Sequence, residues 1–454
     1  MDTLFPTTLL TVIEPFAPLF AANHFLYFRG WIVAMLLLGE TRKCVTNIAR
    51  VCFFVERHVS SWERFLSQAQ WDLPAVQQRL VTLLRERLGD QLLVAGAYLA
   101  WVDTTLVAKV KGRMPGVQPW HDHSGNPDRG AHLVGHHWAL AGLLGLTALA
   151  TPWTPLCWPL LANLIPGQEA PFGFVVSPDG VARAMTFWDV VCPLIAHLQQ
   201  CLASAPLRVV ADAYFCKAPF LNWLLRLPVP VHVITRMRWD AIGWDDPEPE
   251  PPLSPGRTPR GRPRLHPRKG RQWKLAQLLT AFPLEPVTVF LYGHLHTLQI
   301  VTRDVWIRDV TSQNVRVVVI KTKGRPLLLL STDLTLCPEV IIQLYALRVA
   351  LELGIRETKQ FCGLGDYQCT GLIPMTRFVC LSVLSWCLGR LTLLTDLQAT
   401  WLHGPDQDPA PLSWTRLSRA TRRYVLRQLF QQSASSADVQ KSPPVPEELL
   451  RLVA

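Results

Sequence analysis

A long stretch without charged side chains constrains the fold of this chain more than any other feature. From Gly130 to Gln168 there is no Asp, Glu, Lys or Arg. A membrane-spanning helix needs about 20 consecutive apolar residues, but prolines interrupt this run, and its longest proline-free part, Leu133–Thr151, contains His136 and His137. Strands covered on both faces read as continuous apolar runs. We therefore expect two buried strands separated by a turn, with a membrane protein as the alternative.

The composition of the chain indicates what kind of partner it binds and in which kind of compartment it works. The chain has 454 residues, which is enough for several domains, and its net charge of +11 favours a polyanionic partner. The 11 cysteines include no CxxC pair, which is typical of a reducing compartment. The N-terminus has no basic region before its first apolar residues, so we expect no signal peptide.

The first 90 residues have a helical pattern. Thr41–Phe54 and Ser60–Gln70 predict two short helices, and the pair Ser60 and Glu63 has the spacing of a capping box. Exposed arginines on two helices joined by a turn fit a helix-turn-helix that reads DNA ends. An ordinary helical bundle with solvated arginines explains the same pattern.

Two acids follow apolar segments that read as strands. Asp103 ends the run LLVAGAYLAWV, and Asp212 follows LRVVA. A carboxylate beside such apolar sequence is costly to bury unless something pairs with it. The carboxyl edge of a sheet is where α/β proteins place ligands. Asp103 in a strand-end turn and Asp212 as a helix cap are the alternatives.

A third acid lies in the stretch Tyr345–Cys362, which reads as one helix. At 3.6 residues per turn, Arg348, Glu352 and Lys359 fall within an arc of about 60°, and Arg356 lies beside it. This polar stripe borders an apolar stripe that must be buried. A solvated face usually alternates its charges, so we expect the stripe to face a bound ligand.

A segment rich in Pro and Arg, Asp245–Lys274, cannot form a core. Its residues Arg260 and Arg262 stand in an RGRP sequence that resembles an AT-hook, which places Arg in a narrow minor groove. Non-specific binding of phosphates is the alternative interpretation.

The rest of the chain alternates between strand and helix patterns. Val287–Ser331 is dense in strands, with turns expected at Ser312–Asn314 and Lys323–Arg325. Pro374–Trp401 reads as a long core helix, and Ser413–Phe430 as a basic amphipathic helix.

Asp103, Asp212 and Glu352 together suggest a metal site. Carboxylates supply the hard oxygen ligands that Mg²⁺ prefers. Three of them can hold two ions, with Mn²⁺ as a substitute, and such a pair supports in-line phosphoryl displacement. The sequence contains neither a Gly-rich phosphate loop nor a Ser/His/Asp set at a recognisable elbow.

These residues carry a resemblance to a known family. Tyr345, Arg348, Glu352 and Lys359 match the spacing Y-(2)-R-(3)-E-(6)-K of the insertion-sequence-four family of DDE transposases. The surrounding sequence LLLSTDLTLCPEVIIQLYALRVALELGIRETKQFCGLGDYQ is similar to that family's third-acid region. WVDTT and RVVADAYF stand where its two aspartates are expected. Ala213 departs from the Arg or Ser usual after the second aspartate, which puts a supporting contact of that site in doubt.

The resemblance implies an α/β fold with a ribonuclease-H-like mixed five-stranded sheet flanked by helices, an inserted β-rich subdomain and an all-helical N-terminal domain. The boundaries that we expect are a helical DNA-binding domain at 1–90, the two parts of the core at 91–240 and 334–405, the loop with its β insertion at 241–333, and a basic helix with a flexible tail at 406–454.

The implied function is a transposase that cuts at insertion-sequence ends and joins them to target DNA. Asp103, Asp212 and Glu352 would bind two Mg²⁺ ions, while Tyr345, Arg348, Arg356 and Lys359 would position DNA phosphates. The N-terminal helices and the basic C-terminal helix would bind the terminal inverted repeats. In relatives a tryptophan of the insertion can stack on a flipped base, for which Trp306 and Trp273 are the candidates.

The resemblance further implies a cut-and-paste route, allows a hairpin intermediate, and implies a homodimer on paired ends. The expected location is the bacterial cytoplasm, in association with the nucleoid and not with a membrane. Two alternatives remain at this point: a catalytically inactive, domesticated DNA-binding protein and a membrane protein with a basic cytoplasmic loop.

Overall fold

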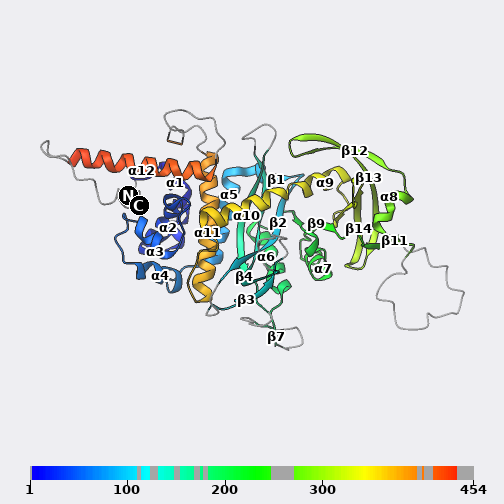
Figure 1. Ribbon diagram of the computed structural model, residues 1–454, viewed down its shortest axis with the longest axis horizontal. Coiled ribbons are helices and arrows are strands. Elements are labelled where there is room, and N and C mark those ends of the chain that lie inside the picture. The colour runs from blue at the N-terminus through cyan, green and yellow to red at the C-terminus, as the bar shows by residue number, and fades with distance from the viewer. Residues whose placement is uncertain are drawn as a thin grey trace.

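The computed structural model shows a mixed α/β protein in which one large mixed sheet is flanked by helices (Figure 1). The structure describes residues 3–109, 114–122, 131–147, 154–167, 174–176, 182–246, 270–395, 401–402 and 413–436. Helices from both ends of the chain gather at one end of the molecule, and the sheet runs from its middle to the other end (Figure 1).

Five strands at the centre of the sheet position the site. Their order is β5-β4-β2-β8-β9. The strands β2 (Ala97–Ala108), β4 (His132–Thr147) and β5 (Thr154–Leu164) pair antiparallel, whereas β8 (Leu207–Ala211) and β9 (His232–Met237) run parallel to β2. The prediction of two buried strands in the uncharged stretch is confirmed by β4 and β5.

The inserted strands continue the same sheet. β15 (Leu327–Ser331) pairs with β9, and the path continues through β14 (Val310–Ile320) and β13 (His294–Ile307), on which β12 (Glu285–Leu291) also pairs. A strand unit was therefore rightly expected here, but it extends the central sheet instead of standing apart from it.

One turn in this unit was wrongly predicted. The chain reverses at Arg308–Asp309, and Ser312–Asn314 lie inside β14. The register between β13 and β14 shifts between Val305 and Ile307. The position of the turn therefore depends on how the two strands pair, and local turn propensity does not report this pairing. The turn predicted at Lys323–Arg325 is confirmed as a bend.

The remaining elements complete the architecture. The other strands are β1 (Leu93–Val94), β3 (Gln118–His121), β6 (Phe174–Val176), β7 (Ala182–Ala184), β10 (Ile242–Trp244) and β11 (Gln272–Lys274). The 3₁₀ turns are η1 (Glu14–Leu19), η2 (Gly89–Leu92), η3 (Ala213–Phe215) and η4 (Leu275–Gln277). Three helices flank or follow the sheet strands: α6 (Phe187–Cys201), α7 (Ala218–Leu225) and α8 (Leu278–Ala281).

The N-terminal region is helical, as predicted. It contains α1 (Thr7–Ile13), α2 (Ala22–Leu38), α3 (Val45–Val51), α4 (Val59–Ser67) and α5 (Leu73–Leu88). The predicted capping box is wrong, because α4 begins one residue before Ser60. His58 caps it instead, and its Nδ1 accepts a hydrogen bond from the Ser60 amide at 3.2 Å.

The long helix α11 (Leu372–Thr395) is the core helix expected near residues 374–401. Among the described residues it is the one helix long and apolar enough to cross a membrane, and 83% of its most apolar window is buried inside the protein. It packs against β5 on one side and against α1, α2 and α4 on another. This burial explains its apolar character as that of a core helix.

The stretch expected to be one helix is two. α9 (Pro338–Ala346) and α10 (Val349–Cys362) meet at a turn through Leu347 and Arg348. Here the amides of Arg348 and Leu351 bond to carbonyls three residues earlier, at 3.1 and 2.9 Å, which tightens the backbone into a 3₁₀ geometry. Tyr345 therefore belongs to a different helix from Glu352 and Lys359.

The basic C-terminal helix is confirmed as α12 (Trp414–Ser436). It packs against α2 and α11. Its last turns take up the beginning of the segment expected as a flexible tail, and the rest of that segment lies outside the described residues.

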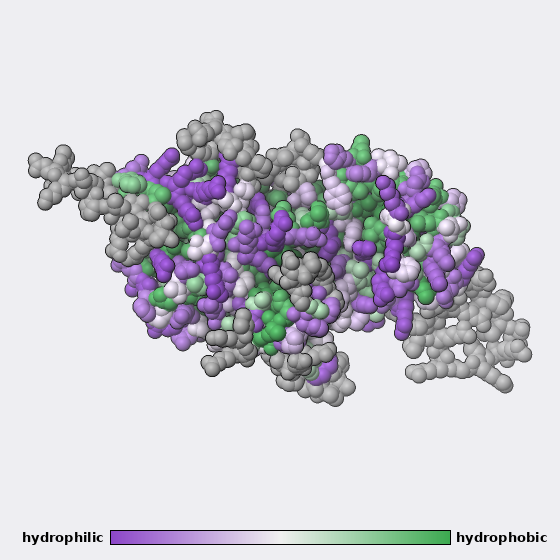
Figure 2. Space-filling model, viewed as in Figure 1, coloured by the Kyte–Doolittle hydropathy of each residue, from purple (hydrophilic) through white to green (hydrophobic). Residues whose placement is uncertain are grey.

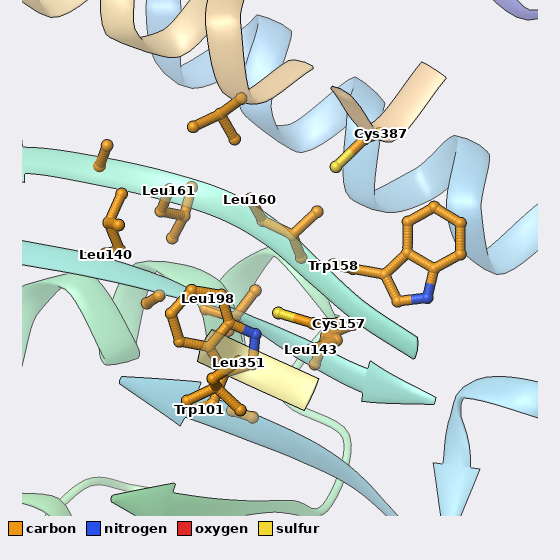
Figure 3. Close-up of a cluster of buried hydrophobic side chains, with 14 of the residues drawn as sticks. Trp101, Leu140, Leu143, Cys157, Trp158, Leu160, Leu161, Leu198, Leu351 and Cys387 are labelled. Carbon is orange, nitrogen blue, oxygen red and sulfur yellow. The ribbon is translucent and has the colours of Figure 1, made fainter. Parts of the chain in front are cut away.

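An apolar core lies between the sheet and α10. Leu351 of α10, Trp101 of β2, Leu143 of β4 and Trp158 of β5 are each at most 1% exposed (Figure 3). Gly354 allows the close approach, since a Cβ there would lie 2.8 Å from the sulfur of Cys157 on β5. The buried face of α10 thereby fixes the direction of its polar face.

Candidate functional site

Two of the three candidate acids lie level with each other on neighbouring parallel strands. The register pairs Trp101 of β2 with Val210 of β8, and two further residues along each strand lead to Asp103 and Asp212. Asp212 follows β8 directly, as predicted. Asp103 does not end its strand, because β2 continues through Ala108 in its pairing with β4.

The Asp103 carboxylate is held by two donors. Arg348 donates to Oδ2 at 2.9 Å, and the Thr104 amide donates to Oδ1 at 2.7 Å. Burial raises the pKa of Asp103 above its usual value and the Asp212 carboxylate adds to this, while Arg348 and the Thr104 amide oppose it. Two like charges and a guanidinium thus share this edge of the sheet.

Glu352 lies with Asp103 around one surface pocket. Its volume is about 550 Å³, and it is lined by Asp103, Thr104, Glu352, Ile355, Arg356, Lys359 and Gln360. Lys359 Nζ donates to the carbonyl oxygen of Leu106 on β2 at 2.9 Å. The structure therefore brings Glu352, Arg356 and Lys359 of the predicted polar stripe together with Asp103, while Arg348 contacts Asp103 but is not among the residues that line the pocket.

Asp212 also caps the 3₁₀ turn η3, in agreement with the alternative prediction that it is a helix cap. Its Oδ1 accepts from the Tyr214 amide at 2.9 Å, and its carbonyl accepts from Thr235 Oγ1 at 2.7 Å. Its other carboxylate oxygen has no hydrogen bond among the described residues.

Tyr345 reaches the same region from α9. Burial raises its pKa, Arg348 and Arg236 lower it, and Asp212 raises it, so Tyr345 lies among the charges of the site. Arg236 on β9 and Tyr292 at the β12–β13 turn also affect Tyr345, and sequence reasoning singled out neither. The Tyr292-Gly293 pair between two strand patterns was the available signal.

The two candidate tryptophans are tied to neighbouring acids. Trp273 is 9% exposed, and its Nε1 donates to Asp245 at 2.7 Å. Trp306 is half-buried, and its Nε1 donates to Asp246 at 2.9 Å. Both indole groups are therefore hydrogen-bonded within the protein. Arg260 and Arg262 lie outside the described residues.

The second glutamate of α10, Glu357, points away from the pocket. Its Oε2 accepts from Arg390 at 2.6 Å and from Trp386 Nε1 at 3.3 Å, both on α11. The side chains of Glu357 and Arg390 are only 13% and 14% exposed. Glu357 therefore joins α10 to α11.

A buried polar network holds the loop that follows α10. His136 Nε2 lies 2.9 Å from the Pro115 carbonyl and must donate to it, so His136 Nδ1 accepts from the Tyr367 hydroxyl at 2.6 Å. Trp138 Nε1 donates to the same hydroxyl at 2.9 Å. Lys109 Nζ donates to the Tyr367 carbonyl at 2.6 Å. This network fixes the end of α10 against β2 and β4.

The three candidate acids are chemically suited to bind a divalent cation, although they do not lie close enough together in this structure to form a complete metal site. No group of three His, Cys, Asp or Glu side chains within the described ranges is close enough to hold a metal ion. However, the negative charge of Asp212 helps to raise the pKa of Asp103, and the Asp103 carboxylate already pairs with the Arg348 guanidinium. A divalent cation would relieve this repulsion, so the donor set fits.

Comparison with known proteins defines the class. Residues 16–288 match the model of a family described as DDE superfamily endonuclease. The match spans more than half of the chain, which belongs to this family. It confirms the prediction of an endonuclease of the DDE class. No curated protein matches the sequence.

One solved structure to which the chain is similar is a piggyBac transposase synaptic complex with hairpin DNA. The identity is 11%, the TM-score is 0.37, and the match covers 94% of this chain and 74% of that chain. A TM-score this low carries no argument about fold or function, so the assignment depends on the family match and the site.

Proposed function

We propose that this endonuclease is a transposase of the insertion-sequence-four type, which cuts DNA at the ends of its element and joins them to target DNA. The observation that carries the proposal is the pocket in which Asp103 and Glu352 face Arg356 and Lys359. The Y-R-E-K spacing around this pocket supports the narrower family. The strand order β5-β4-β2-β8-β9, with one antiparallel and one parallel half, supports a ribonuclease-H-like core.

Each side chain has a role that its position supports. Asp103, Asp212 and Glu352 would hold two Mg²⁺ ions, which would activate the attacking oxygen and stabilise the leaving oxygen. Lys359 and Arg356 line the pocket and would hold phosphates beside the scissile bond. Arg348 holds Asp103 in place and would also contact a phosphate, and Tyr345 would support it from α9.

In this mechanism the side chains of the protein take little direct part in making or breaking covalent bonds. The attacking oxygen is that of water in the first cut and of a 3′-hydroxyl in strand joining. In each step its proton goes to solvent, and the P–O bond to the leaving oxygen breaks as the new one forms. Rigid placement of the acids by β2, β8 and α10 supplies the orientation.

Three further properties belong to this proposal. The protein would act as a homodimer on paired ends, would work in the bacterial cytoplasm at the nucleoid, and would follow a cut-and-paste route in which a hairpin can form. The basic net charge of +11 and the DDE class support a DNA partner.

The test is cleavage of DNA that carries the inverted repeats flanking the gene, with and without Mg²⁺. We expect a Mg²⁺-dependent cut at each repeat, and denaturing gels then separate hairpin from open ends. Binding to the repeats without any cut in Mg²⁺ or Mn²⁺ would favour the inactive, domesticated protein instead.

A further inference from the structure

Arg348 pairs with one of the three candidate acids from outside the pocket. Its Nη2 donates to Oδ2 of Asp103 at 2.9 Å, and Arg348 is not among the residues that line the pocket. Both side chains are 19% exposed, so the pair is mostly shielded from solvent. Within the described part of the chain, neither Asp212 nor Glu352 has an ion-pair partner. Asp103 is thus the candidate acid whose charge is already partly neutralised.

The guanidinium of Arg348 lies in the region of both candidate aspartates. Asp103 and Asp212 stand level on neighbouring parallel strands. The charges of Arg348 and Asp212 both act on Asp103. The same two charges also act on Tyr345. An ion held by the two aspartates would have to lie against the same carboxylates, so the guanidinium and such an ion would compete for Asp103.

The pairing with Asp103 leaves Arg348 incompletely bonded. Its Nε is buried and has no hydrogen-bond partner among the described residues. A buried donor without a partner costs free energy. Arg348 stands in the tight turn between α9 and α10, and its side chain does not cap α10. Guanidinium groups bind phosphate in a bidentate manner, so a phosphate can satisfy donors that Asp103 leaves unused.

The surface near Arg348 suits an anionic partner. Hydrophilic side chains cover the middle of the molecule in the region of α10 (Figure 2). Arg356 is exposed, lines the pocket, and makes no hydrogen bond or ion pair within the described ranges. It lies eight residues after Arg348, which is about 12 Å along a helix. Each strand of duplex DNA carries one phosphate per about 3.4 Å of axis, so one strand can contact both arginines.

We propose that Arg348 controls metal binding: in the free protein it occupies Asp103, and a DNA phosphate at the pocket takes up its guanidinium and leaves Asp103 to a divalent cation. This proposal rests on the proposed function, because it takes the metal site and the DNA at the pocket as given. By linkage, DNA raises the affinity for the cation, and the cation raises the affinity for DNA by the same factor. Such an endonuclease binds its cation mainly when DNA is in place.

The first test measures Mn²⁺ binding to the full-length protein without DNA, at pH 8, by electron paramagnetic resonance. Arg348→Gln removes the competing charge, so it should bind Mn²⁺ about tenfold more tightly than the wild type. Arg348→Lys keeps a charge beside Asp103 and should stay close to the wild type. If Arg348 only supported the site, its loss would weaken binding instead. Unchanged or weaker binding in Arg348→Gln overturns the proposal.

Arg356→Gln is the matched control for charge. It removes the same charge from the same pocket, but Arg356 has no hydrogen bond or ion pair with Asp103. Its general electrostatic effect should raise the affinity for Mn²⁺ by about threefold at most, because solvent and salt screen an exposed charge. An equal gain in both Gln variants would attribute the effect to net charge and refute a specific role of Arg348. Circular dichroism checks that each variant is folded.

The second test adds a duplex that ends at the inverted repeat and so has no flanking strand to cut. After subtraction of the ions that DNA binds alone, DNA should tighten Mn²⁺ binding to the wild type by about tenfold. The gain in Arg348→Gln should be about threefold at most, because Asp103 is already accessible in this variant. Equal gains in the two proteins would contradict release of Arg348 by phosphate.

Failure of this proposal can be told apart from failure of the proposed function. If Asp103→Asn, Asp212→Asn and Glu352→Gln all bind Mn²⁺ as the wild type does, the metal site is wrong and both proposals fall. If these acids bind the ion and Arg348→Gln gains nothing, only the role of Arg348 is wrong. A wild type that binds Mn²⁺ through these acids but does not bind this DNA refutes the transposase assignment and the release step together.

Discussion

The two sides of α10 carry one glutamate each, and their surroundings differ. Glu352 is exposed and lines the pocket with Asp103, whereas Glu357 is packed against α11 and paired with Arg390. Both are glutamates of one helix, five residues apart. The comparison teaches that the candidate catalytic acid is the one with no hydrogen-bond or ion-pair partner among the described residues, in a helix whose other acid joins it to α11.

The largest expected effect separates these two roles. Glu352→Gln should lower the cleavage rate by roughly 10³-fold or more, because a missing ligand to the metal pair costs several kcal/mol of transition-state stabilisation. The free energy of unfolding should change by at most about 0.5 kcal/mol, since the side chain is exposed. Single-turnover cleavage and urea unfolding measure the two quantities. Glu56→Gln, at another exposed glutamate, is the control that should change neither.

Glu357→Gln should show the reverse pattern. It removes the carboxylate charge that pairs with the Arg390 guanidinium in a mostly buried position, so we expect a loss of about 2 kcal/mol in the free energy of unfolding. The cleavage rate per folded molecule should stay within about twofold, because Glu357 does not face the pocket. Adding Arg390→Met should recover part of the stability. If Glu357→Gln stopped cleavage while leaving stability unchanged, the two roles would have been assigned the wrong way round.

The network at the end of α10 should make stability depend on pH. Burial lowers the pKa of His136 to about 4, below the 6.5 of an unfolded chain. Between these values the unfolded state binds more protons, so stability is complete above about pH 6.5 and falls as the pH drops toward 4. From pH 7 to pH 5 we expect a loss of roughly 1–2 kcal/mol at this site. Urea unfolding of wild type and His136→Gln at both pH values measures it, and the difference between the two proteins should shrink at low pH. An equal pH dependence in both would show that His136 is not the group responsible.

The smallest effect concerns the packed side of α10. In Gly354→Ala the new Cβ would meet Cys157 at 2.8 Å, and the strain of overpacking exceeds the gain in helix propensity by about 1 kcal/mol. The displaced helix should also slow cleavage by a few fold. Cys157→Ala in the same protein makes room and should restore both properties. A stabilised Gly354→Ala protein with full activity would mean that this contact does not position Glu352.

The sequence alone predicted those parts of the fold and of the site that local patterns determine. The charge-free stretch predicted β4 and β5, and the polar stripe predicted that Glu352, Arg356 and Lys359 share one face of a helix. It missed the break at Arg348 and the continuation of β2 beyond Asp103, because tertiary hydrogen bonds and strand pairing decide both. It could not detect the pairing of Glu357 with Arg390 across two helices. Arg236 on β9 and Tyr292 at the β12–β13 turn come near Tyr345 only through the tertiary fold, and the Tyr292-Gly293 pair was the one sequence signal for either of them.

The most direct test of the central claim is a titration of Mn²⁺ into the wild type and into Asp103→Asn, Asp212→Asn and Glu352→Gln, followed by electron paramagnetic resonance. If the three acids form one metal site, each substitution should weaken Mn²⁺ binding by about tenfold or more while the fold, by circular dichroism, stays intact. Wild-type Mn²⁺ affinity in any one of the three variants would remove that acid from the site and contradict the account.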